Sequence, residues 1–421
     1  MGQCNCAPSG RVAARVRDWR LAYGLACLQF FLAGFLLAAS APILPQLAIE
    51  WRLGPAQLGL LGSALFYAYA AVQIPAGVLA DAFGSRRVLI LSALLAALGA
   101  AGFGAAPSFG AAVVTRLVVG AGTGLVYTAG VRLIAELASR QPVEGGRFVA
   151  LYGPFVAMNY LGSALASIPL LVMVDLVGWR LPLAGTAAVA AALAAATWAL
   201  PSPAERDGRR RGTRLRAGMA AWSAERTIWA YTTLRFLYGS FAGMQALWAV
   251  PLLLVTFQAS REVVGVVLLA MSLGQIIGPP LAAWLAVRSH QSQRVVMGGA
   301  IAYAVISLAL VGMIRVQLGP GFLTVVFFML SVAQSLTLIG YGLVTARVAP
   351  DLQGTMAGLV NLGPFLGSAL FQVIAGFLVQ GQVSASGTNL VAEANYAVVL
   401  LLLMIVAIVA IPLTRLLTER T

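Results

Sequence analysis

Long apolar runs, separated by short polar segments, fill most of the chain. A helix that spans a membrane needs about 20 largely apolar residues, and twelve such runs follow one another. None alternates apolar and polar residues as a membrane barrel strand does, and lipid offers no partner for unpaired backbone groups. The pattern therefore predicts an all-α polytopic membrane protein with 12 transmembrane helices. The runs lie at 20–45, 56–78, 88–106, 111–137, 147–173, 181–200, 227–257, 263–287, 295–315, 321–347, 354–380 and 395–415.

Composition supports this class and narrows the chemistry. Of the 421 residues, 60% are hydrophobic and 10% are charged, and the mean hydropathy is +0.91. A soluble domain of this size does not need so much apolar surface. Three cysteines make no disulfide framework, and the single histidine, His290, makes no metal cluster. The sequence has no Gly-Lys-Ser/Thr phosphate loop. We therefore expect no metal, no cofactor and no enzymatic activity.

The basic residues predict the orientation in the membrane. All 27 of them are arginines. With the N-terminus inside, 20 arginines fall in inner segments, four in outer loops and three within predicted helices. The positive-inside rule then places both termini in the cytoplasm, in a bacterial-type inner (plasma) membrane. The net charge of +14 is this rule summed over the inner segments, so it does not indicate nucleic-acid binding. The expected partners are the lipid bilayer and a small solute, and we expect a monomer.

A polar, arginine-rich segment at 201–226 divides the twelve runs into six and six. It is either a solvated linker or, over 214–226, a helix on the inner surface. The predicted organisation is a tail, a first half, this linker, a second half and a tail, at 1–19, 20–200, 201–226, 227–415 and 416–421. Short matches recur at offsets of roughly 210 residues, as expected for two parallel, pseudo-symmetric six-helix bundles. They pair Pro42 with Pro251, Arg87-Val88 with Arg294-Val295, and Gly153-Pro154-Phe155 with Gly363-Pro364-Phe365.

The hinge between the second and third runs, at 77–87, has the sequence Gly-Val-Leu-Ala-Asp-Ala-Phe-Gly-Ser-Arg-Arg. It resembles the loop 2–3 signature of the major facilitator superfamily. Arg116 opens an Arg-x-x-x-Gly-x-Gly pattern that is also similar to that family, and so is Gly178-Trp179-Arg180. The antiporter signature of the fifth helix is not met, which argues against a drug/proton antiporter. The resemblance implies the two-bundle fold of that family and secondary active transport by alternating access.

The same resemblance implies a gate at the cytoplasmic side, where this loop holds the two halves together in the outward-open state. Two glycines are expected to allow close approach and a tight turn. Ala82 and Ser85 replace the usual basic residues of the motif, so an Arg–Glu pair one turn apart in the fourth run is the expected reinforcement. The predicted gating residues are Gly77, Asp81, Gly84, Arg86, Arg87, Arg132 and Glu136.

Charges inside the spans are the best clue to the substrate, because a charge in the membrane is costly and usually functional. Arg116 and Arg235 lie within apolar runs, whereas no acidic residue is centred in one. Arginine offers a rigid fork for carboxylate or phosphate. Each arginine could instead extend to the headgroups. The remaining predicted substrate contacts are polar residues within spans, for which hydrogen bonding between helices is the plain alternative. They are Gln29, Tyr67, Tyr238, Gln245, Asn159, Gln334 and Asn361; Gln73, Tyr160, Gln275, Thr337 and Tyr341 are weaker candidates of the same kind.

The favoured hypothesis is a transporter of a small organic or inorganic anion, moved by symport with protons as the coupling ion or by exchange. The absence of a central carboxylate makes exchange, or coupling through protonation of the substrate itself, more attractive. The first alternative is efflux of amphipathic compounds such as drugs. A remote alternative is a membrane sensor or scaffold that transports nothing, although the short loops leave little surface for a partner.

Overall fold

The computed structural model describes residues 10–138, 147–200, 222, 224–289, 291–314, 319–345, 347–348, 353–386 and 396–417. Every regular element in these ranges is helical. The predicted linker at 201–226, with its possible surface helix, lies almost wholly outside them. Twelve stretches of the described helices are long and apolar enough to cross a membrane. The predicted helical class and the number of spans are therefore confirmed.

The first half of the chain supplies six spans. The helices are α1 (Gly10–Ala38), α2 (Ser40–Trp51), α3 (Pro55–Phe83), α4 (Ser85–Gly104), α5 (Phe109–Ala138), α6 (Arg147–Leu165), α7 (Ile168–Val177) and α8 (Arg180–Ala199). α1 begins at Gly10, ahead of its membrane-crossing stretch, which starts at Trp19. α1 with α2, and α6 with α7, each form one broken span.

The second half supplies the other six. Its helices are α10 (Arg226–Gly243), α11 (Ala249–Pro251), α12 (Arg261–Ser289), α13 (Ser292–Gly312), α14 (Pro320–Leu336), α15 (Gly340–Thr345), α16 (Gln353–Ser386) and α17 (Ala397–Thr414). α10 and α11 belong to one span that also contains two π-helical turns, Met244–Trp248 and Leu252–Thr256. A short 3₁₀ turn, Thr337–Ile339, joins α14 to α15.

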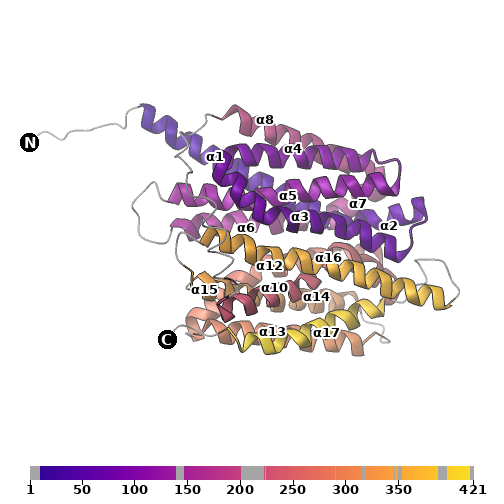
Figure 1. Ribbon diagram of the computed structural model, residues 1–421. Helices are drawn as coiled ribbons and strands as arrows, with labels where there is room; N and C mark the ends of the chain where they lie inside the picture. Colours follow the sequence, from indigo (N-terminus) through magenta and orange to yellow (C-terminus); the bar gives the residue numbers. More distant parts are fainter. Residues whose placement is uncertain are drawn as a thin grey trace, which may run out of the picture.

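The two halves form neighbouring bundles with the same internal arrangement (Figure 1). In the first half α1 packs on α6, α3 on α5 and α4 on α8. In the second half the corresponding pairs are α10 with α16, α12 with α14, and α13 with α17. α1 begins and α17 ends at the same end of the bundle. Following the predicted orientation, we call this the inner end and the opposite one the outer end.

Proline interrupts the first span of each half at matching places. Pro42 lies in the first turn of α2, directly after the break at Ala39, and Pro251 lies between the two π-helical turns. Proline has no N–H to give to the carbonyl four residues earlier, so a continuous α-helix is disfavoured at both positions. The pairing of Pro42 with Pro251 in the sequence therefore reflects a shared irregularity in the fold.

The halves meet along two seams. The first runs along α3 and α16, and the second joins α6 and α7 to α12. Toward the outer end α2 also packs against the turn Met244–Trp248 and α11. A single apolar cluster here includes residues of both halves, such as Leu44, Leu61 and Leu247. The corresponding cluster toward the inner end, around Phe30 and Phe155, contains residues of the first half alone. The outer end is therefore the more tightly joined one.

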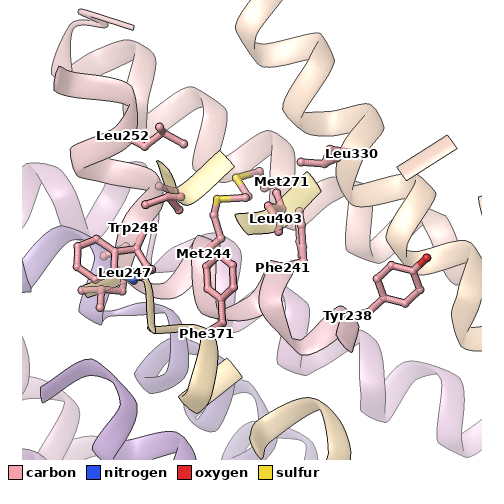
Figure 2. Close-up of a cluster of buried hydrophobic side chains, with 14 of the residues drawn as sticks. Tyr238, Phe241, Met244, Leu247, Trp248, Leu252, Met271, Leu330, Phe371 and Leu403 are labelled. Carbon is pink, nitrogen blue, oxygen red and sulfur yellow. The ribbon is translucent and has the colours of Figure 1, made fainter. Parts of the chain in front are cut away.

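The second half has its own dense core around the seventh span. Figure 2 shows Phe241, Met244 and Trp248 of this span packed among side chains of α12, α14, α16 and α17. Met244 and Trp248 are completely buried. Inside a membrane, close van der Waals packing of this kind, rather than removal of apolar surface from water, fixes the irregular span within its half. This core makes the C-terminal bundle a firm support for Arg235, which lies one and a half turns before Phe241 on α10.

Candidate functional site

Arg235 lies in the inner part of α10 and is the side chain around which the candidate site is built. The residue keeps some accessible surface, but its Nη1 is buried and has no hydrogen-bond partner in the part of the chain that the structure describes. None of the four ion pairs found there includes it. A guanidinium cannot be neutralised by deprotonation in a protein. Arg235 is thus a cation that lacks a protein counter-ion among the described residues.

A connected group of five tyrosines from both halves begins beside this arginine. Tyr160 and Tyr231 lie within electrostatic range of Arg235 itself, and the others lie within range of these two or of one another. All except Tyr231 are partly exposed, although they lie inside the bundle. We call these side chains the Arg235 cluster; its members are Arg235, Tyr127 on α5, Tyr152 and Tyr160 on α6, Tyr231 on α10 and Tyr341 on α15.

Some phenol groups of the Arg235 cluster already have partners. The hydroxyls of Tyr127 and Tyr152 lie 3.1 Å apart, and the hydroxyl of Tyr231 donates to the carbonyl of Leu338 at 3.1 Å. Sequence reasoning considered Tyr160 and Tyr341 but missed Tyr127, Tyr152 and Tyr231. Tyr127 lies well inside its span, away from the headgroup level where tyrosine is common, and this was an available signal. Tyr152 and Tyr231 lie near the inner ends of theirs, where a tyrosine gives no such signal.

A polar bridge between the halves adjoins the Arg235 cluster. Asn361 on α16 donates to Oε1 of Gln73 on α3 at 3.0 Å. One turn away, Tyr69 stacks on Phe365 with ring centroids 3.5 Å apart. Tyr69 also lies within electrostatic range of Tyr127 and Tyr152. Asn361 is therefore a predicted polar contact that the structure places beside these tyrosines, and it is half-buried.

The structure does not bring Arg116 to this site. Its side chain is 3% exposed, near the outer part of α5. Nε donates to the carbonyl of Leu61 at 2.8 Å, and Nη2 donates to Ser40 Oγ at 2.6 Å and to the carbonyl of Gly62 at 3.2 Å. The guanidinium also lies 5.4 Å from the ring centre of Phe103. All of these partners belong to the first half, so Arg116 joins spans 1, 2 and 4 and has no surface left for a substrate. In this structure Arg116 therefore has a structural environment away from Arg235, and its predicted role as a substrate contact stays a prediction.

Two further predicted contacts on the seventh span point into the second half. Tyr238 is 1% exposed and packs edge-on against Tyr303 at 5.1 Å, toward α13 (Figure 2). Gln245 donates to Ser272 Oγ at 3.3 Å and accepts from Gln275 at 2.6 Å, which joins the span to α12. Tyr238 follows Arg235 by three residues, so the two residues lie on nearly the same face of the helix. The Tyr238 ring nevertheless points into the core of the second half, where it packs against Tyr303.

Of the other predicted contacts, Gln29, Asn159 and Gln334 take part in packing within one half, whereas Tyr67 lies beside a cluster with residues of both halves. Gln29 donates to Thr197 Oγ1 at 2.8 Å and is 4% exposed. Asn159 donates to the carbonyl of Phe30 at 3.1 Å. Gln334 is buried beside Ser335, and Tyr67 packs at the edge of an apolar cluster. For these residues the plain alternative, hydrogen bonding or packing between helices, describes the geometry better than substrate contact.

The hinge at the inner end shows a compact polar network. Gly84 has φ +81°, which a residue with a side chain rarely adopts, so glycine provides the tight turn between α3 and α4. Ser85 Oγ donates to Glu136 at 3.3 Å, and Arg132 Nε donates to the same carboxylate at 2.8 Å. Ser85, which stands where the family motif has a basic residue, therefore still links the hinge to the Arg132–Glu136 pair of α5.

The remaining hinge residues behave differently from one another. Arg86 donates to the carbonyls of Thr197, at 3.2 Å, and Trp198 at the end of α8, where a cation also favours the helix dipole. Arg87 is exposed. A Cβ at Gly77 would meet nothing within 4 Å, so the expected close approach at Gly77 is wrong. The side chain of Asp81 lies outside the described part of the structure.

One ion pair joins the halves at the outer end. Arg261, at the start of α12, donates to Asp175 of α7, which also accepts from Gln46 at 3.4 Å. A second ion pair lies nearby but within the first half: Arg180 and the indole N–H of Trp179 donate to Glu50 at 2.6 and 2.9 Å. These two donors, Arg180 first, hold the pKa of Glu50 below its usual range.

Residues 26–372 match the model of the family described as "Major Facilitator Superfamily". The chain belongs to the major facilitator superfamily. The fold agrees: the crystal structure of the nucleoside transporter NupG superposes with a TM-score of 0.74 at 15% identity, covering 96% of this chain and 100% of that one.

Two relatives transport chemically different solutes. The "Probable sulfoacetate transporter SauU" of Cupriavidus necator is 32% identical over 166 residues, 39% of this chain and 37% of that protein. The L-fucose-proton symporter of Escherichia coli is 30% identical over 139 residues, 32% of this chain and 31% of that protein. The chain matches only about a third of the length of either relative, 37% and 31%. The chain is thus a multi-pass member of this superfamily, and the names of its relatives do not point to one class of solute.

Proposed function

We propose that this transporter moves a small organic anion across the membrane by alternating access, with Arg235 as the group that holds the anionic end of the substrate. The carrying observation is Arg235 itself, a partly accessible residue whose buried Nη1 has no hydrogen-bond partner among the described residues and which has Tyr160 of the first half within electrostatic range. Arginine presents paired N–H donors that match a carboxylate or sulfonate. The surrounding tyrosines offer hydroxyls and apolar ring faces to the organic part of such a substrate.

The relatives support the acidic class only in part. Sulfoacetate, named for one of them, is an anion, whereas L-fucose is a neutral sugar. A site made for a neutral sugar would gain nothing from an unpaired cation, because the buried charge costs free energy unless a ligand compensates it. The charge of Arg235 therefore favours the anion.

In the proposed cycle the structure corresponds to the inward-facing state. The arginine count favours the inner end as the cytoplasmic one, with both termini in the cytoplasm of a bacterial cell. The anion would meet the Arg235 cluster from that side, and the halves would then rock to open the outer end. Gly84, Arg86, Arg132 and Glu136, together with Asp81 and Arg87, would act at the inner gate.

The test is transport by the purified protein in proteoliposomes. A panel of acetate, benzenesulfonate and sulfoacetate is compared with L-fucose as a neutral solute. We expect uptake of at least one anion, and a loss of roughly 30-fold or more in Arg235→Gln, since truncating one partner of a buried charge pair costs about 2–5 kcal/mol. Arg288→Gln is the matched control, because Arg288 is exposed at the inner end of α12.

Two results would contradict the proposal. One is uptake of fucose, or of cationic amphiphiles, with no uptake of any anion. The other is anion transport that Arg235→Gln leaves at the rate of Arg288→Gln. Arg235→Lys is expected to fall between wild type and Arg235→Gln, because lysine keeps the charge and loses the fork.

A further inference from the structure

Arg235 has no counter-ion among the described residues. This affects whether the transporter can change between its inward-facing and outward-facing states with the site empty. The sequence has 13 acidic residues, and none is centred in a span. The carboxylates that take part in ion pairs in the described ranges are Glu50, Glu136, Asp175 and Glu225, whose partners are other arginines. In the ranges that the structure describes, no carboxylate pairs with Arg235.

Alternating access requires an occluded state, in which the site is closed to water on both sides. An empty transporter would have to pass through this state with the guanidinium of Arg235 desolvated and unpaired, which is unfavourable. The phenols of Tyr127, Tyr152 and Tyr231 have partners already and carry no negative charge. A bound anion supplies the missing charge and accepts the N–H groups, so the loaded transporter passes through the same state at a lower cost.

We propose that the protein is an obligatory exchanger, in which an anion must be bound at Arg235 for the transporter to change sides in either direction. This rests on the proposed anion specificity. One anion moves inward for each anion of equal charge that moves outward, so a cycle transfers no net charge. No proton is needed, because no carboxylate in the spans has to be neutralised. The counter-substrate is a second small anion that the same guanidinium can hold.

Arg116, the other arginine within a span, does not need a bound anion in this way. Its guanidinium is surrounded by three oxygens of its own half. These partners move with it when the halves rock as bodies, so its charge is compensated in every state. Arg235 depends on what enters from solution.

The test compares uptake of labelled sulfoacetate and benzenesulfonate into two sets of proteoliposomes. One set contains the same unlabelled anion inside, and the other contains only a zwitterionic buffer. The sulfonate group of both probes stays ionised at neutral pH, so neither crosses the lipid as a neutral acid. Benzenesulfonate in addition has no group that could carry a proton with it, whereas sulfoacetate has a carboxylate. We expect uptake at least roughly 10-fold faster with anion inside, and no dependence on an imposed pH gradient or membrane potential.

Equal rates in the two sets would overturn the inference, and so would accumulation in anion-free vesicles driven by a pH gradient. Both results would leave the proposed anion transport standing. Failure of both sets to take up either anion would instead contradict the proposed function. Protein-free vesicles and Arg235→Gln give the background rate.

A second variant tests the cause. Tyr160 lies within electrostatic range of Arg235, so Tyr160→Glu places a carboxylate beside the guanidinium. We expect the empty form of this variant to change sides, so that the stimulation by internal anion falls toward one-fold. Tyr160→Gln, which has the size of glutamate without its charge, is the control: its uptake is expected to be slower than that of wild type, because a cluster side chain is lost, but the ratio of the rates with and without internal anion should stay at the wild-type value. Unchanged stimulation in a folded Tyr160→Glu protein would mean that the missing counter-ion is not what prevents the empty transporter from returning.

Discussion

Arg116 and Arg235 give the same signal in the sequence, an arginine within an apolar run, but they lie in opposite environments. Arg116 is 3% exposed and donates to three oxygens. Arg235 keeps accessible surface, and its buried Nη1 has no partner among the described residues. A guanidinium whose donors are used within the protein stabilises the fold, whereas one with unused donors is available to a ligand. The hydrogen bonds that each guanidinium makes within the protein, more than its burial, therefore distinguish the structural Arg116 from Arg235 of the candidate site.

The largest effect is expected for Arg116→Leu. It removes the cation that joins three spans and leaves the carbonyls of Leu61 and Gly62 facing an apolar side chain. Breaking a buried, charge-assisted network of this kind costs about 3–5 kcal/mol. The midpoint of thermal unfolding in detergent should fall well below that of Arg288→Leu, the exposed control. A wild-type midpoint for Arg116→Leu would remove the distinction between the two arginines.

Arg235→Leu should behave in the opposite way in the same assay. The substitution removes a charge without a protein partner, so the free energy of unfolding should stay within about 0.5 kcal/mol of wild type or rise. Transport of the anion should nevertheless be lost. A marked fall in the unfolding midpoint would show that Arg235 stabilises the fold after all.

The bridge between Asn361 and Gln73 should have a moderate effect. Gln73→Leu and Asn361→Leu each remove one partner of a hydrogen bond across the seam, and a double-mutant cycle should give a coupling of about 1 kcal/mol. Transport rates and unfolding midpoints of the two single variants and the double variant supply the cycle. If the effects of the two substitutions simply add, the hydrogen bond between Asn361 and Gln73 does not help to hold the two halves together.

The outer ion pair should have a smaller effect, because both side chains are more than a third exposed and solvent weakens such pairs to about 0.5 kcal/mol. Asp175→Asn should roughly double the population with an open outer end. A cysteine placed by Leu61→Cys, at a position fully buried here, reports this population through labelling by an impermeant maleimide. Glu50→Gln, which breaks a pair within one half, should leave the labelling rate unchanged.

The smallest effect concerns pH. The pKa of Glu50 is lowered in the folded protein, chiefly by Arg180, so the stability it contributes is present above the ordinary pKa of about 4.5 and is lost as pH falls through the lower, folded value. The contribution is a few tenths of a kcal/mol, since the pair is exposed. The difference in unfolding midpoint between wild type and Glu50→Gln should shrink from pH 6 to pH 3. A constant difference would contradict the assignment.

The architecture could be predicted from sequence because it depends on the length of apolar runs and on a repeat, both of which are local or periodic features. The functional contacts could be predicted only partly. An arginine in an apolar run is visible in the sequence, but the carbonyls of Leu61 and Gly62 that bind Arg116 come from another helix. In the same way, Tyr127, Tyr152 and Tyr231 are ordinary tyrosines until three spans from two halves bring them together.

The two seams also differ in how far their specific contacts extend along the membrane normal. The α3–α16 seam extends from close backbone contact of Gly376 with Pro55 near the outer end to the Gln73–Asn361 bridge near the Arg235 cluster. The specific contacts of the other seam, Gly265 with Ile168 and Arg261 with Asp175, lie at its outer end. We expect the α3–α16 contacts to persist while the halves rock, and the contacts of α6 and α7 with α12 to separate. A covalent cross-link across α3 and α16 should then slow transport less than one across α7 and α12.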